Sequence, residues 1–123
     1  MSPIVVVVDD DPVMQRLLAT VLGSSGYQVV TTSDTDEGIQ LVREERPDLV
    51  LVDATMPGRD GYEFCRELRA DPLVPAQPYL VLLTAAEVDP QQVTTAGFDE
   101  FISKPIDPPV MLEHLAAIIG QRQ

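Results

Sequence analysis

Residues 4–12 read IVVVVDDDP, and this stretch decides the fold class. Five consecutive β-branched residues are typical of a strand that is buried on both faces, as in the parallel sheets of α/β proteins. Three aspartates follow, and the third stands directly before Pro12. Aspartate is a favoured N-cap and proline is favoured at the first helical position, so Asp11-Pro12 predicts a helix start. The stretch therefore predicts a central strand that passes through an acidic turn into a helix.

The same strand-then-helix pattern recurs along the rest of the chain. Short apolar runs bounded by turn residues predict five strands, at Ile4–Val8, Tyr27–Thr31, Leu49–Val52 running into Asp53, Tyr79–Leu83 stopping at Thr84, and Glu100–Ser103. Cap, proline and spacing signals predict five helices: from Asp11-Pro12 to near Gly23, from a Ser33 cap to before Pro47, over about Tyr62–Ala70, from Asp89-Pro90, and from Asp107-Pro108. Strands that alternate with helices at this spacing predict an α/β fold with a doubly wound five-stranded parallel sheet flanked by five helices.

Two of the predicted helices carry apolar residues at helical spacing, which indicates a face that packs on the sheet. The predicted core positions are Val13, Leu17, Leu18, Val21 and Leu22 in the first helix and Val110, Met111, Leu115, Ile118 and Ile119 in the last.

Length and composition limit the possible functions. A chain of 123 residues fits one domain, predicted over residues 1–123. The net charge of −12 repels nucleic acid, so direct nucleic-acid binding is not expected. The apolar runs are far shorter than the roughly 20 residues of a membrane span, and no basic leader begins the chain, so we expect a cytoplasmic protein with no membrane partner. A single cysteine, Cys65, is expected to be a buried apolar residue.

Chemically active side chains stand where the predicted strands end. In a parallel sheet these ends lie at one edge, where α/β proteins bind their ligands. Asp11 is assigned to the helix cap and is left out of the site. Three converging carboxylates repel one another unless a hard divalent cation neutralises them, and such cations prefer oxygen ligands. The residues at this edge are Asp9, Asp10, Asp53, Thr84 and Lys104.

These residues resemble the motifs of a CheY-like receiver domain of two-component signalling, over essentially the whole chain. The likeness rests on several short motifs in the right order: Asp9-Asp10, Asp53 followed by Met56-Pro57 and Asp60-Gly61, Thr84-Ala85, and Lys104-Pro105. The resemblance implies the flavodoxin-like strand order 2-1-3-4-5. It also implies a response regulator that takes a phosphoryl group from a phosphohistidine of a sensor histidine kinase or histidine phosphotransfer protein, in a Mg²⁺-dependent reaction for which Mn²⁺ is an alternative ion.

The resemblance assigns a role to each site residue. Asp53 is the phosphoacceptor, Asp10 and Asp53 bind the metal directly, Asp9 binds it through water, and Thr55 offers its backbone carbonyl. Lys104 and Thr84 are expected to contact the phosphoryl oxygens. Phe101 occupies a strand position typical of the core, yet the resemblance makes it, with Thr84, part of a conformational switch. The switch is expected to remodel the face of the fourth helix, fifth strand and fifth helix, where an effector or a second copy binds.

Three alternatives remain open from the residues alone. An aspartate-nucleophile phosphohydrolase would also start from a strand-ending aspartate, but it would carry an acid where Thr55 stands. A flavin- or nucleotide-binding module would need a glycine-rich phosphate cradle after the first strand, where this chain has aspartates. A degenerate receiver would act only as an interaction module, although every expected site residue is present.

The receiver is expected not to be an enzyme, although transfer and autodephosphorylation use its own site. The single histidine, His114, is expected to be an exposed helix residue.

Overall fold

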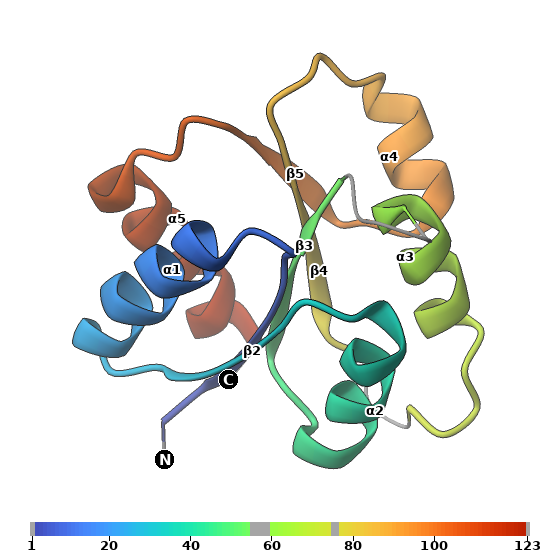
Figure 1. The fold of residues 1–123 in the computed structure, drawn as a ribbon, viewed down its shortest axis with the longest axis horizontal. Helices are drawn as coiled ribbons and strands as arrows, with labels where there is room; N and C mark the ends of the chain where they lie inside the picture. The colour runs from blue at the N-terminus through green and yellow to red at the C-terminus, as the bar shows by residue number, and fades with distance from the viewer. Residues whose placement is uncertain (1, 55–59, 75–76, 123) are drawn as a thin grey trace.

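The computed structural model describes residues 2–54, 60–74 and 77–122, and strands alternate with helices throughout (Figure 1). The elements are β1 (Ile4–Val8), α1 (Pro12–Ser24), β2 (Gln28–Thr32), α2 (Thr35–Glu45), β3 (Leu49–Asp53), α3 (Gly61–Arg69), β4 (Tyr79–Thr84), α4 (Pro90–Ala96), β5 (Glu100–Ser103) and α5 (Pro108–Arg122). All strand pairs are parallel, and the order in the sheet is β2-β1-β3-β4-β5. The predicted fold class and strand order are confirmed.

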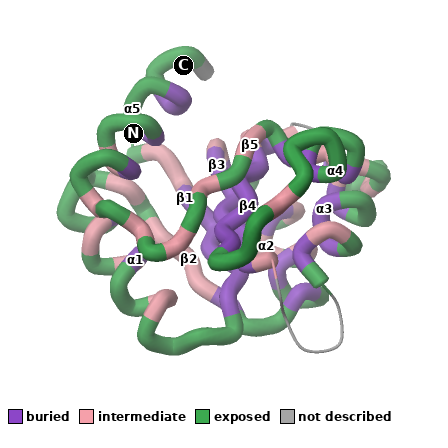
Figure 2. The backbone as a smooth tube through the Cα atoms, turned by 90° about the horizontal axis from the view of Figure 1, so that it is seen from above, coloured by how far each residue is buried: buried purple, intermediate pink, exposed green. Residues whose placement is uncertain are grey.

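Two apolar layers enclose the sheet, because successive side chains of a strand point to opposite faces. Val6 and Val8 of β1 pack with Phe64 of α3 on the face covered by α2, α3 and α4. Val5 and Val7 pack with the residues of α1 and α5 on the other face, as the two helix groups in Figure 1 show. Figure 2 shows the buried strands between these layers. The all-apolar runs thus serve two cores, which explains why they show no alternation with polar residues.

The helix starts are set by aspartate caps, with one correction to the sequence prediction. Asp11 caps α1 through the Val13 amide, as predicted. Helix α2 is capped by Asp34 and not by Ser33, because the Asp34 carboxylate accepts hydrogen bonds from two amides of the first turn. Strand β2 runs through Thr32, one residue further than predicted. The Thr32 hydroxyl accepts a hydrogen bond from the Asp34 amide. This longer strand moves the cap one residue along the chain.

The second strand begins at Gln28 and not at the predicted Tyr27. The Tyr27 amide donates to the Leu22 carbonyl at the end of α1, so it is not available to the sheet.

Three apolar residues predicted to lie in the core are exposed. Val13 is 74% exposed and Leu17 is 39% exposed on α1, while Val110 is 63% exposed on α5. A helix buries only the stripe that faces the sheet, and these residues lie beside that stripe although they fit the helical spacing. The core side of α1 is formed by Leu18 and Leu22, which are fully buried. Of the five core positions predicted in α5, the four other than Val110 are buried.

Within the described residues, no helix is long and apolar enough to cross a bilayer.

Candidate functional site

Asp9 follows β1 directly and lies fully inside the protein. Its Oδ1 accepts a hydrogen bond of 2.9 Å from the Asp11 amide, whereas its Oδ2 has no hydrogen-bond partner among the described residues. Burial raises the pKa of Asp9 to about 6, and the nearby Asp53 carboxylate adds to this rise against the lowering effect of the Asp11 amide. A buried, incompletely bonded carboxylate is costly unless a ligand compensates it.

Asp53 is the last residue of β3, the middle strand of the sheet, and its side chain is 13% exposed. The Lys104 Nζ lies 3.3 Å from Asp53 Oδ1 and 3.8 Å from Asp9 Oδ2. The backbone places this lysine, because the Lys104 amide donates to the Thr84 carbonyl at 2.8 Å and so extends the β4–β5 pairing by one residue. One ammonium group therefore faces two carboxylates and balances half of their charge.

The residues at this edge fit a divalent cation. Oxygen atoms of Asp9, Asp10 and Asp53 all lie within 4.8 Å of one another. The three carboxylates outnumber the single Lys104 ammonium, and Asp9 Oδ2 accepts no hydrogen bond among the described residues. Hard cations such as Mg²⁺ bind carboxylate oxygens of this kind. The predicted contribution of the Thr55 carbonyl lies outside the described residues.

Thr84 ends β4, next to β3 in the sheet, and its side chain is buried. Asp53 pairs with Leu83, so Thr84 stands one residue beyond the partner of Asp53. The Thr84 Oγ1 accepts a hydrogen bond of 3.1 Å from the Ala86 amide. The hydroxyl thus holds the segment that follows β4, on the strand next to the Asp53 carboxylate.

Phe101 lies in β5 opposite Leu82, and its side chain is 36% exposed. The aromatic ring is therefore not a core residue in this structure. It borders a cavity of about 350 Å³ whose other lining residues come from the segment after Thr84 and from Ser103. Of the two residues that the sequence predicts to form the switch, Phe101 lines this cavity, and Thr84 directly precedes the segment that lines it.

Two residues to which the sequence analysis assigned no role of their own support the acidic edge. Gly61 begins α3, and a Cβ at this position would lie 2.5 Å from the Asp53 carbonyl oxygen. Glycine is therefore required for the close approach of α3 to β3. The pair Asp60-Gly61 indicates a turn in the sequence, but a turn signal does not show that Gly61 lies against the backbone of Asp53. The Gln15 side chain donates to the Asp9 carbonyl, a contact across six residues that no motif indicates.

Cys65 and His114 lie outside this site, as expected. Cys65 is buried in the core, and burial raises the pKa of its thiol to about 12, so it is not a reactive thiolate. His114 is 49% exposed on α5 and pairs with the Glu100 carboxylate. The same carboxylate accepts a hydrogen bond of 3.1 Å from the Tyr79 hydroxyl.

Comparison with known proteins places this fold and site in a family. Residues 5–116 match the response regulator receiver domain. The DNA-binding response regulator MtrA of Mycolicibacterium smegmatis is 38% identical over 121 residues, which is 97% of this chain and 51% of that protein. The transcriptional regulatory protein AfsQ1 of Streptomyces coelicolor is 32% identical over 125 residues, covering 98% of this chain and 54% of that protein. The chain thus spans about half the length of these relatives.

Solved structures show the same relationship. The chemotaxis response regulator CheY4 of Vibrio cholerae superposes with a TM-score of 0.86 at 26% identity, covering 96% of this chain and 99% of that one. The signal receiver domain of a histidine kinase from Syntrophus aciditrophicus superposes with a TM-score of 0.84 at 30% identity, covering 98% of this chain and 92% of that one. Because these matches extend over nearly all of the chain and agree with its fold, this protein belongs to the response regulator receiver domains of two-component signalling.

Proposed function

We propose that Asp53 is the phosphoryl acceptor and that the donor is a phosphohistidine of a sensor histidine kinase or of a histidine phosphotransfer protein. The observation that carries this proposal is the placement of the Asp53 carboxylate at the end of the central strand, beside the Lys104 ammonium and within the acidic cluster. Asp9 has no exposed surface for a donor to reach, whereas the Asp53 side chain is 13% exposed.

The transfer makes one bond and breaks one bond. A carboxylate oxygen of Asp53 attacks the phosphorus, the new oxygen–phosphorus bond forms, and the phosphorus–nitrogen bond of the phosphohistidine breaks. The electron pair of that bond stays on the imidazole nitrogen. The product is an acyl phosphate on Asp53, a known form of carboxylate nucleophilic catalysis.

The other site residues stabilise the charge of the phosphoryl group. The Lys104 ammonium already contacts Asp53 and provides a positive charge for one phosphoryl oxygen. The Thr84 hydroxyl donates to another oxygen after it turns from Ala86. Asp10 and Asp53 would hold Mg²⁺ or Mn²⁺ directly, and Asp9 would hold it through water. A bound cation offsets the charge of the carboxylates and of the phosphoryl oxygens together.

The same site supports the return to the unphosphorylated state. A water oxygen attacks the phosphorus, the bond between phosphorus and Asp53 breaks, and inorganic phosphate leaves while the Asp53 carboxylate is restored. On this proposal the domain is a signalling protein and not an enzyme, although it carries its own phosphotransfer and autodephosphorylation chemistry.

Phosphorylation signals through Thr84 and Phe101. The move of the Thr84 hydroxyl toward the phosphoryl group releases the Ala86 amide, and Phe101 turns inward into the space that Thr84 vacates. Burial of one aromatic ring contributes at most about 1.5–3 kcal/mol, so it biases the switch without locking it. The face of α4, β5 and α5 changes as a result and binds an effector or a second copy. The exposed Phe101 and Val110 side chains support this choice of face.

Two further proposals concern DNA binding and location. MtrA is named as a DNA-binding response regulator, and we propose that any DNA contact of a longer protein is made outside residues 1–123, because this domain has a net charge of −12. A cytoplasmic location is proposed because response regulators are generally cytoplasmic.

Phosphorylation of purified variants tests the acceptor. Acetyl phosphate with Mg²⁺ should add one phosphoryl group to the wild type, measured by intact-protein mass spectrometry, and none to Asp53→Asn. Asp89→Asn is the matched control, because Asp89 caps α4 on the surface and asparagine caps equally well. Equal incorporation into the wild type and Asp53→Asn would show that another residue is the acceptor.

A further inference from the structure

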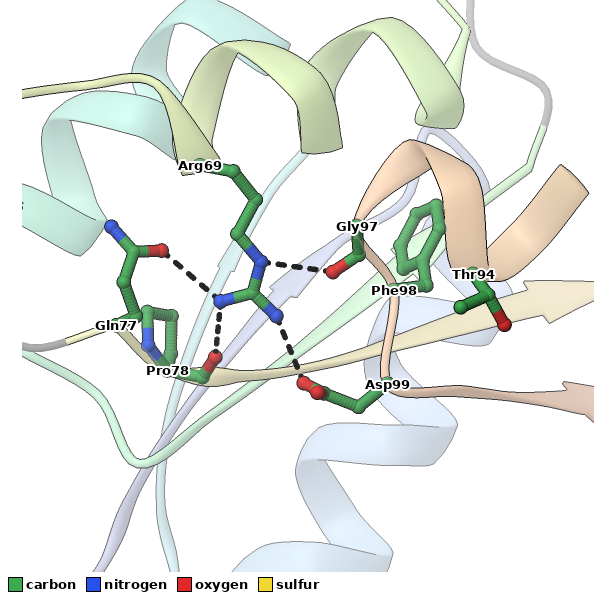
Figure 3. Close-up of a pocket in the computed structure, with 7 residues that line it drawn as sticks. All are labelled: Arg69, Gln77, Pro78, Thr94, Gly97, Phe98 and Asp99. Carbon is green, nitrogen blue, oxygen red and sulfur yellow. Dashed lines mark hydrogen bonds and ion pairs between the residues drawn. The ribbon is translucent and has the colours of Figure 1, made fainter.

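Arg69, the last residue of α3, is hydrogen-bonded to two separate segments, the one before β4 and the one between α4 and β5 (Figure 3). Its Nε donates to the Gly97 carbonyl at 2.8 Å, beyond the end of α4. One terminal nitrogen donates to the Gln77 side chain at 3.1 Å and to the Pro78 carbonyl at 2.9 Å, just before β4. The other pairs with Asp99 at 2.9 Å, just before β5. A guanidinium suits this role because its donors form a rigid planar fork.

The C-terminal end of α4 is held by further contacts around this guanidinium. Asp99 is bonded to β4 in both directions, because its carboxylate accepts the Leu80 amide at 2.8 Å and its own amide donates to the Leu80 carbonyl at 2.9 Å. The Phe98 ring packs edge-on against Tyr62 of α3 with centroids 5.9 Å apart. Gly97 has a φ of 109°, and a Cβ there would lie 2.8 Å from Arg69 Cγ. The chain after α4 is therefore fixed to both α3 and β4.

The opposite end of α4 is held more loosely. Ala85, Ala86 and Glu87 are exposed between β4 and α4. The bond from the Ala86 amide to the Thr84 hydroxyl holds this segment, and the proposed function would break it. The buried residues of α4 are Val93, at its middle, and Ala96, its last residue, and none lies in the first turn. Besides the bond between Ala86 and Thr84, Val88 packs partly buried against the core just before α4. The end of α4 near the phosphorylation site is thus held by fewer polar contacts than the end at Gly97, and one of them is made by the switch residue Thr84.

We propose that Arg69 is a positioning residue that anchors the C-terminal end of α4, so that phosphorylation makes this helix rotate about Gly97 and does not displace it as a whole. The inference rests on the proposed function, in which Thr84 releases the segment before α4. A helix fixed at one end converts the release into a defined rotation. Without the anchor, the same release leaves α4 with several positions and weakens the response of β5, where Phe101 lies.

A second arginine offers a matched control. Arg43 in the last turn of α2 contacts the Asp71 carboxylate, with its Nε at 2.9 Å and a terminal nitrogen at 2.8 Å. Asp71 follows α3 just as Asp99 follows α4. The two pairs therefore have the same chemistry and sequence separations of 28 and 30 residues, but the Arg43 pair does not join α4.

The first test uses hydrogen exchange of the unphosphorylated protein. Arg69→Met should raise the exchange rate of the Leu80 and Phe98 amides at least tenfold, whereas Arg43→Met should leave them within twofold of the wild type. Asp99→Asn is the second variant, because asparagine can still accept the Leu80 amide while the ion pair is lost. It should raise the Phe98 rate in the same direction. Unchanged rates at these amides in both Arg69→Met and Asp99→Asn would overturn the anchoring role.

The second test uses aromatic NMR of Phe101 with Mg²⁺ and beryllofluoride, a mimic of the phosphoryl group. The change in the Phe101 signals should fall to half or less in Arg69→Met and stay at the wild-type size in Arg43→Met. Phosphorylation of Asp53 by acetyl phosphate should remain within twofold in both. An undiminished Phe101 response in Arg69→Met overturns the inference. A wild type that takes up no phosphoryl group contradicts the proposed function instead, and the exchange rates then decide on the anchor alone.

Discussion

Asp9 and Asp10 are neighbours in the sequence, yet the fold gives them different environments. Asp9 is fully buried with one oxygen lacking a hydrogen bond, while Asp10 is exposed. Asp9 follows β1 directly, and Asp10 lies one residue further on, where the chain turns toward α1. The sequence indicates an acidic pair, but it does not show which of the two carboxylates is buried.

This burial predicts a pH dependence for the metal-free protein. The pKa of Asp9 is raised from 3.8 to about 6 in the fold, so the folded state binds more protons than the unfolded state between these values. Stability should therefore fall as the pH rises through this window. Between pH 5 and pH 7 the loss amounts to about 1 kcal/mol, since one pKa unit corresponds to roughly 1.4 kcal/mol.

Urea denaturation in EDTA measures this effect. Asp9→Asn should abolish the loss and be the more stable protein at pH 7, because asparagine keeps the oxygen that accepts the Asp11 amide and removes the buried charge. Asp10→Asn should retain most of the pH dependence, because burial of Asp9 remains its main cause. The same pH dependence in Asp9→Asn as in the wild type would assign the effect to another group.

At the scale of single elements, two neighbouring residues, Ser33 and Asp34, could each cap the start of α2. Asp34 accepts the Asp36 amide at 2.8 Å and the Glu37 amide at 3.3 Å, although Ser33 stands one residue earlier. Asp34→Ala should lower the free energy of unfolding by about 1 kcal/mol, the usual effect of losing an N-cap. Ser33→Ala is the control and should change it by less than about 0.5 kcal/mol, as exposed substitutions do. Chemical denaturation decides between them, and a larger loss in Ser33→Ala would restore serine as the cap.

The helices also show that helical spacing does not determine which apolar residues are buried. Helical spacing identifies Leu18 and Val110 equally well as apolar positions, but the first is fully buried and the second is mostly exposed. The position of a helix over the sheet depends on contacts with strands that are distant in the sequence. The outward residues of α1 and α5 could therefore not be separated from the inward ones beforehand.

At the scale of the whole molecule, the acidic edge links metal binding to folding. The unfolded chain does not hold Asp9, Asp10 and Asp53 together, so a cation that binds this cluster stabilises the folded state. At 100 times its dissociation constant, Mg²⁺ should raise the free energy of unfolding by about 2.7 kcal/mol.

Thermal denaturation with increasing Mg²⁺ measures this stabilisation. Asp10→Asn should lose most of it, while Asp89→Asn, which lies outside the cluster, should retain it. A wild-type melting temperature that does not change over the titration would contradict a metal site at this edge.

The sequence by itself determined the five strands, the alternation with helices and the acidic strand ends. These features depend on short segments: β-branched runs such as Val5–Val8, caps such as Asp11, and carboxylates placed directly after apolar runs. Only the tertiary structure decided the exposure of Phe101, the need for Gly61 beside the Asp53 carbonyl, and the partners of Arg69. Asp99 lies 30 residues from Arg69, and no local pattern encodes such a contact. It arises because the packing of helices on the sheet brings distant loops together, whereas propensity and spacing describe only neighbours along the chain.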